Sequence, residues 1–267
     1  MTAYPTAAFD NAEQWQHLCQ SFALMDAAQR NPATSVWLPQ LLDHEHCEKL
    51  LRHLTPIIHS PSLKVTASLL SKRYAYLATA ASLYAMTVYD AGLDMSAQNC
   101  FLDYTYKDNL WQSKMPISDC RVSRPTSSDD REEWRERVVS NLFANHLALL
   151  WQVLVDVTKV HPRILWENTA VRVYSLYEKK ITTTSPIIKE KIQEDYAYLL
   201  KQAAPEVFGI DHNPLKRYNV KKIQLTEDSG LIRLRKSCCF YYKATDPMEY
   251  CSNCPLLVVK PKRKKRV

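Results

Sequence analysis

Four cysteines crowd into a stretch of seventeen residues near the C-terminus. Cys238 and Cys239 are adjacent, and after eleven intervening residues Cys251 and Cys254 form a Cys-x-x-Cys pair. In a reducing compartment, clustered cysteines are more often metal ligands or redox groups than structural disulfides. Thiolates are the ligands that zinc and iron–sulfur clusters prefer. The pattern therefore indicates a metal centre with these four sulfur ligands or a redox-active thiol pair.

The spacing alone leaves three interpretations open. A structural zinc site usually has two Cys-x-x-Cys pairs, whereas one pair here is vicinal, and adjacent side chains of an extended chain point in opposite directions. A [2Fe-2S] cluster is wider and accepts four thiolates from a less tightly wrapped chain. A redox dithiol formed by Cys251 and Cys254 alone would leave the vicinal pair without a role, and no βαβ pattern surrounds it.

The segment around these cysteines resembles the signature of a known family. The sequence RKSCCFYY at residues 235–242, followed by YCSNCPL at residues 250–256, is similar to the C-terminal signature of the FhuF-like siderophore-iron reductases. In that family a Cys-Cys pair and a Cys-x-x-Cys-Pro motif hold a [2Fe-2S] cluster, usually with ten residues between the pairs rather than the eleven of this chain. More loosely, SRPT at residues 123–126 and LWENTA at residues 165–170 resemble the helical body of the family.

The resemblance implies a cytoplasmic oxidoreductase that frees iron from imported ferric siderophores of hydroxamate or citrate type. Its cofactor would be a [2Fe-2S] cluster held by the four cysteines, with no catalytic residue beyond the cluster. Siderophores bind Fe(III) through hard oxygen donors, and Fe(II) binds the same oxygen cage less tightly. One-electron reduction would therefore also release the iron.

Many ferric siderophores are anionic, so basic residues near the cysteines are candidate substrate ligands. Arg233, Arg235 and Lys236 lead directly into Cys238, and Arg233 and Arg235 would share one face of a strand predicted at residues 231–235. The alternative is that the two arginines form the solvated face of an edge strand. A second group of candidates comes from the family-like segment: Trp166, Asn168 and Arg172. Trp166 is, however, more typical of a core residue.

The charge distribution and the glycine content limit the classes of partner and cofactor that the chain could bind. The chain has 267 residues and a net charge of +7, and residues 260–267 carry six basic residues and no acid. The rest of the chain is nearly neutral, and this basic tail is predicted to be solvated and disordered. The three glycines lie far apart, which excludes Gly-rich nucleotide-binding loops.

The electrons must come from a partner, because nothing in the sequence indicates a flavin or nicotinamide site. We expect a ferredoxin- or flavodoxin-like donor, which the basic tail would dock if the donor is acidic. The tail would make at most a peripheral contact with a membrane surface, and no nucleic-acid partner is expected. The rival hypothesis is a zinc-stabilised binding protein that uses the tail on nucleic acid.

Hydrophobic periodicity predicts helices over most of the first 200 residues. The fold class is therefore α+β, with a predominantly helical body, a few short strands and a small C-terminal cysteine-rich iron–sulfur module. The strands are predicted at residues 99–106, 120–124 and 231–235. The predicted division is a substrate-binding body at 1–203, a connector and [2Fe-2S] module at 204–259, and the tail at 260–267.

The sequence shows no secretory signal at its N-terminus and no run of 18 apolar residues. The best candidate span, residues 138–157, is interrupted by polar side chains such as Asn141, His146 and Asp156. It is predicted to be a core helix. The protein is accordingly expected to be soluble and cytoplasmic.

Overall fold

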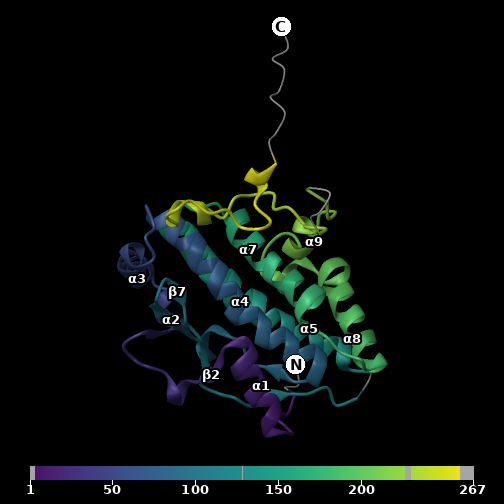
Figure 1. Cartoon of the computed structure of the whole chain (residues 1–267). Helices are drawn as coiled ribbons and strands as arrows, with labels where there is room; N and C mark the ends of the chain where they lie inside the picture. Colours follow the sequence, from purple (N-terminus) through teal and green to yellow (C-terminus); the bar gives the residue numbers. More distant parts are fainter. Residues whose placement is uncertain (1–3, 128, 226–229, 259–267) are drawn as a thin grey trace.

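A computed structural model describes residues 4–127, 129–225 and 230–258 (Figure 1). The basic tail at 260–267, with its predicted disorder and docking role, lies outside these residues. Most of the described chain is helical, as predicted. The helices are α1 (Ala12–Phe22), α2 (Leu38–Leu41), α3 (His44–Ile57), α4 (Leu63–Tyr89), α5 (Arg131–Leu142), α6 (Ala148–Thr158), α7 (Pro162–Ser175), α8 (Pro186–Ala197) and α9 (Pro214–Tyr218).

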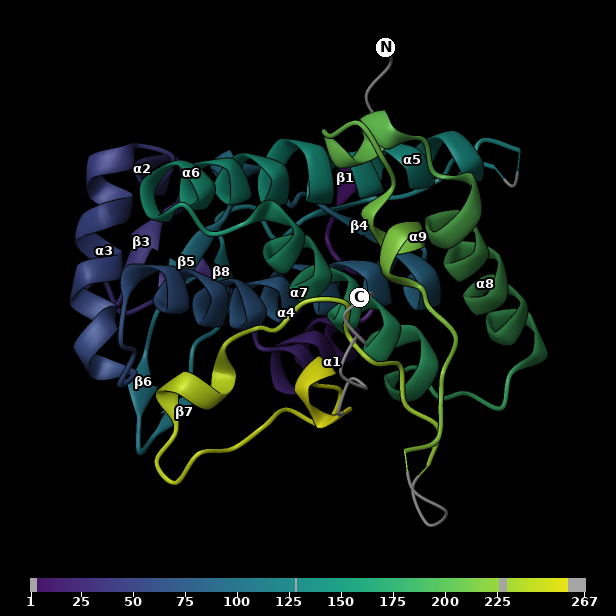
Figure 2. The ribbon, with the colours of Figure 1, turned by 90° about the horizontal axis from the view of Figure 1, so that it is seen from above.

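The central element is α4, and the other helices pack around it (Figures 1 and 2). The helix begins where the Ser62 hydroxyl accepts a hydrogen bond from the Val65 N–H. It ends where Asp90 takes a left-handed conformation, which turns the chain out of the helix. Its alanine- and leucine-rich sequence is buried on nearly every side, and its largest partner is α7. A helix that is apolar all round is expected to lie in the core.

The helical segment Arg131–Thr158 comprises α5, a π-helical turn at Phe143–Leu147, and α6. Among the described residues, this segment is long and apolar enough to cross a membrane, and 56% of its most apolar window is buried within the protein. His146, in the π-helical turn, is fully buried and contacts the Tyr74 hydroxyl at 2.5 Å and the Met95 carbonyl oxygen at 2.6 Å. The segment thus packs as the core helix that the sequence predicts.

The strands are short and form small separate sheets. β9 lies between β1 and β4 and is antiparallel to both, β2 runs parallel to β8, β3 pairs with β5, and β6 pairs with β7 as a hairpin. Their bounds are β1 (Thr6–Ala7), β2 (Leu24–Asp26), β3 (Ser35–Trp37), β4 (Gly92–Leu93), β5 (Phe101–Asp103), β6 (Tyr106–Lys107), β7 (Leu110–Trp111), β8 (Met115–Ile117) and β9 (Val122–Ser123).

The strand predicted at residues 231–235 is wrong. A single bridge between Ile223 and Ile232 is found there instead of a ladder. Beyond the bridge the chain does not continue along a neighbouring strand, because Arg235 N–H donates its hydrogen bond to the carbonyl oxygen of Asn253. The predicted fold class is nevertheless confirmed: the body is mainly helical, and the cysteine-rich segment is a compact appendage.

The C-terminal segment crosses one end of α4 and α7 (Figure 2). Its 3₁₀ turn at Tyr241–Ala244 packs against α4. The Ser68 hydroxyl of α4 donates a hydrogen bond of 2.8 Å to the Cys239 carbonyl oxygen. The segment therefore rests directly on the helical body, while the predicted boundaries at 203/204 and 259/260 stay predictions.

Removing the charge of Asp195 should destabilise the body. This fully buried carboxylate of α8 accepts hydrogen bonds from Arg131 at 2.9 and 3.0 Å and from Arg135 at 3.1 Å, both in α5. Asp195→Asn removes the counter-charge that the structure gives Arg135 and leaves Arg131 with Asp90 alone, at an expected cost of about 3 kcal/mol. Thermal or urea unfolding measures the loss. Glu133→Gln, which breaks an exposed pair with Arg137, is the control and should cost less than about 1 kcal/mol.

Candidate metal centre

The four cysteines of the C-terminal segment meet as two pairs. Cys239 Sγ lies 3.7 Å from Cys251 Sγ, and the Cys238 thiol interacts with the Cys254 thiol. Each pair therefore joins one cysteine of the vicinal motif to one of the Cys-x-x-Cys motif. Cys239 and Cys254 are each only 1% exposed, whereas Cys238 and Cys251 are partly exposed.

The backbone after the vicinal cysteines is shaped to face sulfur. Phe240 adopts a left-handed conformation with φ of 64°, which is uncommon for a residue with a side chain. Its N–H donates to Cys238 Sγ at 3.3 Å, and the Tyr241 N–H hydrogen-bonds to Cys239. Successive N–H groups in such a turn form a concave site for negative charge, as at many iron–sulfur centres.

The distance between the Cys239 and Cys251 sulfurs fits ligation of a shared metal ion. Two thiolates on one tetrahedral ion, with metal–sulfur bonds of about 2.3 Å, lie about 3.8 Å apart. The distance between Cys239 and Cys251 is 3.7 Å. Across the described ranges, no group of three or more His, Cys, Asp or Glu side chains is arranged to hold a metal ion. A separation of this size therefore suits two thiolates on one metal ion, whether that ion is zinc or one iron of a cluster.

Positive charge lies close to the pair formed by Cys239 and Cys251. The pKa of Cys239 is lowered, first by its hydrogen bond with Cys251 and then by the charges of Lys72 and Arg235. Burial lowers the pKa of Lys72, against the opposing effect of Cys239 and Cys251. Cations beside thiolates offset the negative charge that a four-thiolate cluster would carry.

Two adjacent polar residues of α7 hold the segment in place. Glu167, 2% exposed, accepts hydrogen bonds from the backbone N–H groups of Lys236 at 2.6 Å and Ser237 at 2.8 Å, and also from the Ser237 hydroxyl. Asn168, fully buried, accepts a hydrogen bond of 2.7 Å from Arg235 and donates to the Ser68 carbonyl oxygen at 2.9 Å. The chain entering Cys238 is therefore tied to α7, and through Asn168 to α4.

The six residues predicted to bind substrate are not brought together. Arg235 and Asn168 bond to each other, and Trp166 is 4% exposed within the core. Arg233 pairs with Glu178 at 2.8 Å, and the Lys236 ammonium donates to the Arg217 carbonyl oxygen. Arg172 lines a cavity beside the cysteines. Substrate binding by these residues stays a prediction, and Arg172 is the member placed to take part in it.

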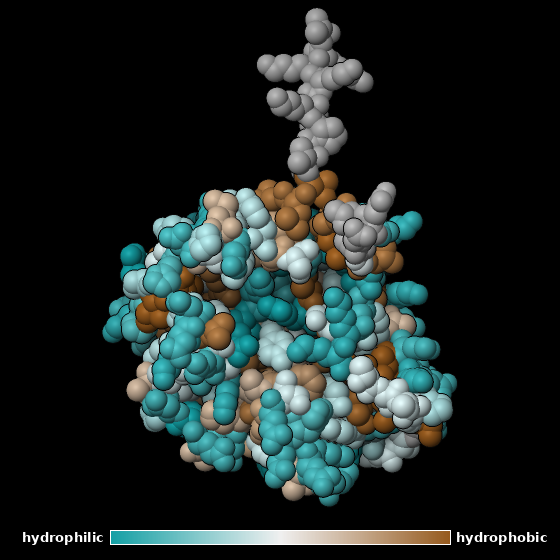
Figure 3. All heavy atoms as spheres, in the orientation of Figure 1, coloured by the Kyte–Doolittle hydropathy of each residue, from teal (hydrophilic) through white to brown (hydrophobic). Residues whose placement is uncertain are grey.

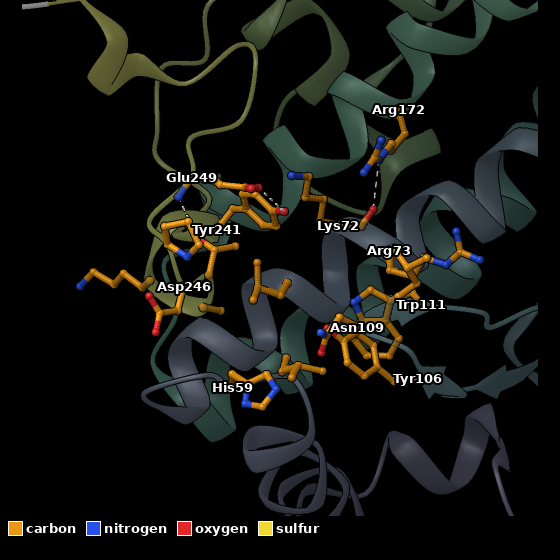
Figure 4. A pocket seen from close by; sticks show the side chains of 17 residues that line it. His59, Lys72, Arg73, Tyr106, Asn109, Trp111, Arg172, Tyr241, Asp246 and Glu249 are labelled. Carbon is orange, nitrogen blue, oxygen red and sulfur yellow. Dashed lines mark hydrogen bonds between the residues drawn. The ribbon is translucent and has the colours of Figure 1, made fainter.

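This main cavity has a volume of about 810 Å³ (Figure 4). Lys72 and Arg73 of α4 line it together with Tyr106 and Trp111 of the β6–β7 hairpin. Tyr241 closes it toward the cysteines, and the Lys72 ammonium lies 4.8 Å from the centre of the Tyr241 ring. The cavity therefore lies next to the cysteines, and its lining residues Lys72 and Tyr241 interact with Cys239.

The sequence analysis missed Lys72, Arg73, Tyr106, Trp111 and Glu167. A signal was present for the two cations, because they are adjacent in a helix whose only other charged residue is Lys64. A signal was also present for Glu167, since a carboxylate between Trp166 and Asn168 in a buried helix needs a partner. The hairpin residues carried no such signal, because aromatic residues in a strand are ordinary.

Two family models match the chain. The model described as "Ferric iron reductase FhuF-like transporter" covers residues 68–224, more than half of the chain, and "FhuF 2Fe-2S C-terminal domain" covers residues 235–256. The chain belongs to the FhuF-like ferric iron reductase family. No curated protein matches it.

Membership of the FhuF-like family decides between the three interpretations of the cysteines. The second match contains all four, so the cofactor is a [2Fe-2S] cluster rather than zinc or a dithiol. The resemblance seen in the sequence is confirmed, and the chain is an oxidoreductase of the ferric iron reductase type that acts on siderophore iron. We propose that Cys238, Cys239, Cys251 and Cys254 are the cluster ligands.

Weakening the Glu167 contact should loosen the cluster. In Glu167→Gln an amide N–H₂ replaces a carboxylate oxygen that accepts backbone hydrogen bonds, at a cost of about 1–3 kcal/mol. The visible absorption of the cluster should then decay about fivefold faster or more in the presence of an iron chelator. Glu190→Gln, an exposed change of the same type in α8, should decay at the original rate. Equal decay of both variants would contradict the positioning role.

Removing the Lys72 charge should lower the reduction potential of the cluster. A reduced cluster carries one more negative charge, which the nearby ammonium stabilises. Lys72→Met should shift the potential to more negative values by on the order of 50 mV, and Lys72→Arg should shift it much less. A dye-mediated redox titration without substrate measures both. An unchanged or more positive potential in Lys72→Met would show that Lys72 does not act on the cluster.

Proposed function

We propose that this FhuF-like protein is a cytoplasmic reductase for siderophores of hydroxamate or citrate type. The ferric siderophore would bind in the main cavity and receive one electron from the [2Fe-2S] cluster. The observation that carries this proposal is the position of the cavity. Lys72 lines the cavity and interacts with Cys239 and Cys251, and Tyr241 lines it two residues after Cys239.

The cavity suits a ferric siderophore in size and lining. Its volume of about 810 Å³ lies in the upper part of the range for small-molecule sites, roughly 300–1,000 Å³. Tyr106 and Trp111 pack edge to face at 5.2 Å and offer an aromatic, largely apolar wall for the ligand backbone. The lining of the cavity carries the carboxylates Asp246 and Glu249 and a larger number of cations, which leaves a net positive charge that attracts anionic chelates; the cations are Lys72, Arg73, Arg172 and Lys243.

Reduction of the ferric siderophore requires the side chains of the cavity only to bind and position the substrate. The bound [2Fe-2S] cluster would supply electrons one at a time, as the conversion of Fe(III) to Fe(II) requires. Fe(II) binds hard oxygen donors less tightly than Fe(III), so the siderophore loses its hold on the iron. No proton transfer or covalent step on the protein is needed. The side chains that line the cavity bind and orient the substrate, and Tyr241 and Lys72 fill the space between it and the cysteines.

The electrons would come from a ferredoxin- or flavodoxin-like donor. Residues 256–258, which follow Cys254 after Pro255, expose apolar side chains, and these contribute to an apolar patch at the C-terminal end of the described chain (Figure 3). Six basic residues follow between positions 260 and 266 in the sequence. An apolar patch followed by basic residues suits an acidic donor that must approach the buried Cys254.

The function is tested by a single turnover without donor. The anaerobic protein, reduced with dithionite and freed of excess reductant, is mixed with a ferric siderophore and a ferrous chelator. We expect one Fe(II) per oxidised cluster, seen as recovery of the visible absorption. Cys251→Ser should lose both the cluster spectrum and the reduction, whereas Cys120→Ser, outside the cluster motif, should keep both. Reduction by a colourless Cys251→Ser protein would overturn the proposal.

A further inference from the structure

A second cavity of about 320 Å³ opens beside the main one. Arg73 and Arg172 line both cavities and so stand between them. The remaining lining comes from α4, α7 and the π-helical turn Leu176–Lys180 that extends α7. We name this second cavity the annex, with its full lining Arg73, Tyr76, Ala80, Arg172, Ser175, Leu176 and Lys180.

The lining of the annex is cationic and contains no carboxylate. In the parts of the chain that the structure describes, Arg73, Arg172 and Lys180 form no ion pair with an acidic side chain. Glu178, on the same π-helical turn, is already bound to Arg233 at 2.8 Å and Lys222 at 2.9 Å. The charge that gathers at the annex is therefore not balanced by the protein there.

Among the described residues, Arg172 and Lys180 keep donors free for a ligand, whereas Arg73 donates two hydrogen bonds to Ser113, from Nε to Oγ at 2.9 Å and from Nη2 to the carbonyl oxygen at 2.5 Å. The Arg172 guanidinium donates its Nε–H to the Lys72 carbonyl oxygen at 3.1 Å. In the described part of the chain, its terminal N–H groups have no acceptor. Arg73 and Lys180 lie over the Tyr76 ring, at 5.5 and 5.0 Å from its centre. The ring holds these two cations on one side of the annex.

The crowding of like charges is unfavourable without an anion. The pKa of Arg172 is lowered by burial and then by repulsion from Arg235 and Arg73. The pKa of Arg73 is lowered by burial, against the attraction of Tyr76 and Asp103. A bound anion would relieve this repulsion, and a planar carboxylate matches the fork of a guanidinium with two parallel hydrogen bonds.

We propose that the annex binds a carboxylate group of the ferric siderophore while the iron lies in the main cavity. This inference rests on the proposed function and narrows it. The preferred substrate is an anionic, carboxylate-bearing ferric chelate of citrate type rather than a neutral trihydroxamate. A neutral complex would leave the three cations of the annex partly desolvated and unpaired, which costs binding free energy.

The substrate preference is tested with gallium complexes, because Ga(III) has the charge of Fe(III) and is not reduced by the cluster. Binding to the oxidised holoprotein is followed by quenching of tryptophan fluorescence, with Trp111 in the main cavity as the reporter. We expect the gallium complex of a citrate-based siderophore to bind at least tenfold more tightly than that of a neutral trihydroxamate. Lys180→Gln should reduce this ratio about fivefold or more.

Lys179→Gln is the matched control, because this neighbouring lysine is exposed like Lys180 but does not line the annex. It should keep the original ratio. Equal affinity of the native protein for the two complexes, or the same loss of ratio in Lys180→Gln and Lys179→Gln, would overturn the inference.

The two proposals fail in different ways. If the gallium complexes bind with the expected ratio but the ferric complexes are not reduced, the annex assignment is supported and the reductase proposal is refuted. If ferric complexes are reduced but carboxylate brings no preference, the reductase proposal is supported and the annex assignment is refuted.

Discussion

The arrangement of the site depends on one buried carboxylate, Glu167, and its neighbour Asn168. The chain that enters the vicinal cysteines has no ladder to hold it, so its backbone N–H groups need acceptors inside the protein. Glu167 accepts from Lys236 and Ser237, and Asn168 binds Arg235. Because both belong to α7, and Asn168 also bonds to α4, the cysteines are fixed to the same two helices that form the wall of the main cavity. A shift of this contact would move the redox centre relative to its substrate.

A second constraint is charge. Lys72, Arg235 and Arg172 lie in or beside the buried region next to the cysteines, where bringing cations together is costly unless anions are present. Two anionic groups are expected there, the thiolate-ligated cluster on one side and the substrate on the other. With the substrate bound as proposed, the same positive charges would serve both, so the cluster and its substrate would share one electrostatic environment.

The sequence predicted the helices well because their signals are local. Ser62 and Asp43 cap α4 and α3, and prolines begin α7 and α8. It also indicated a [2Fe-2S] cofactor at the four cysteines, since a vicinal pair followed by a Cys-x-x-Cys pair is rare by chance. It did not predict how the cysteines combine or where the cavity lies. Alternation suggested that Arg233 and Arg235 share a strand face, but each turns to a different helical partner, Glu178 or Asn168. Such partners lie more than 50 residues away, beyond the reach of any local pattern.

The loop that joins the Cys-Cys motif to the Cys-x-x-Cys motif contributes both to the arrangement of the cysteines and to the main cavity. The two ends of the loop are held together, because each sulfur pair joins a cysteine before the loop to a cysteine after it. Between these ends, residues 241–249 supply one wall of the main cavity. The eleven residues between Cys239 and Cys251 could therefore change in number and reshape that wall without changing the sulfur pairs. A change in the length of this loop could therefore alter which ligand shapes the cavity accepts while the sulfur pairs, through which electrons would pass, stay the same.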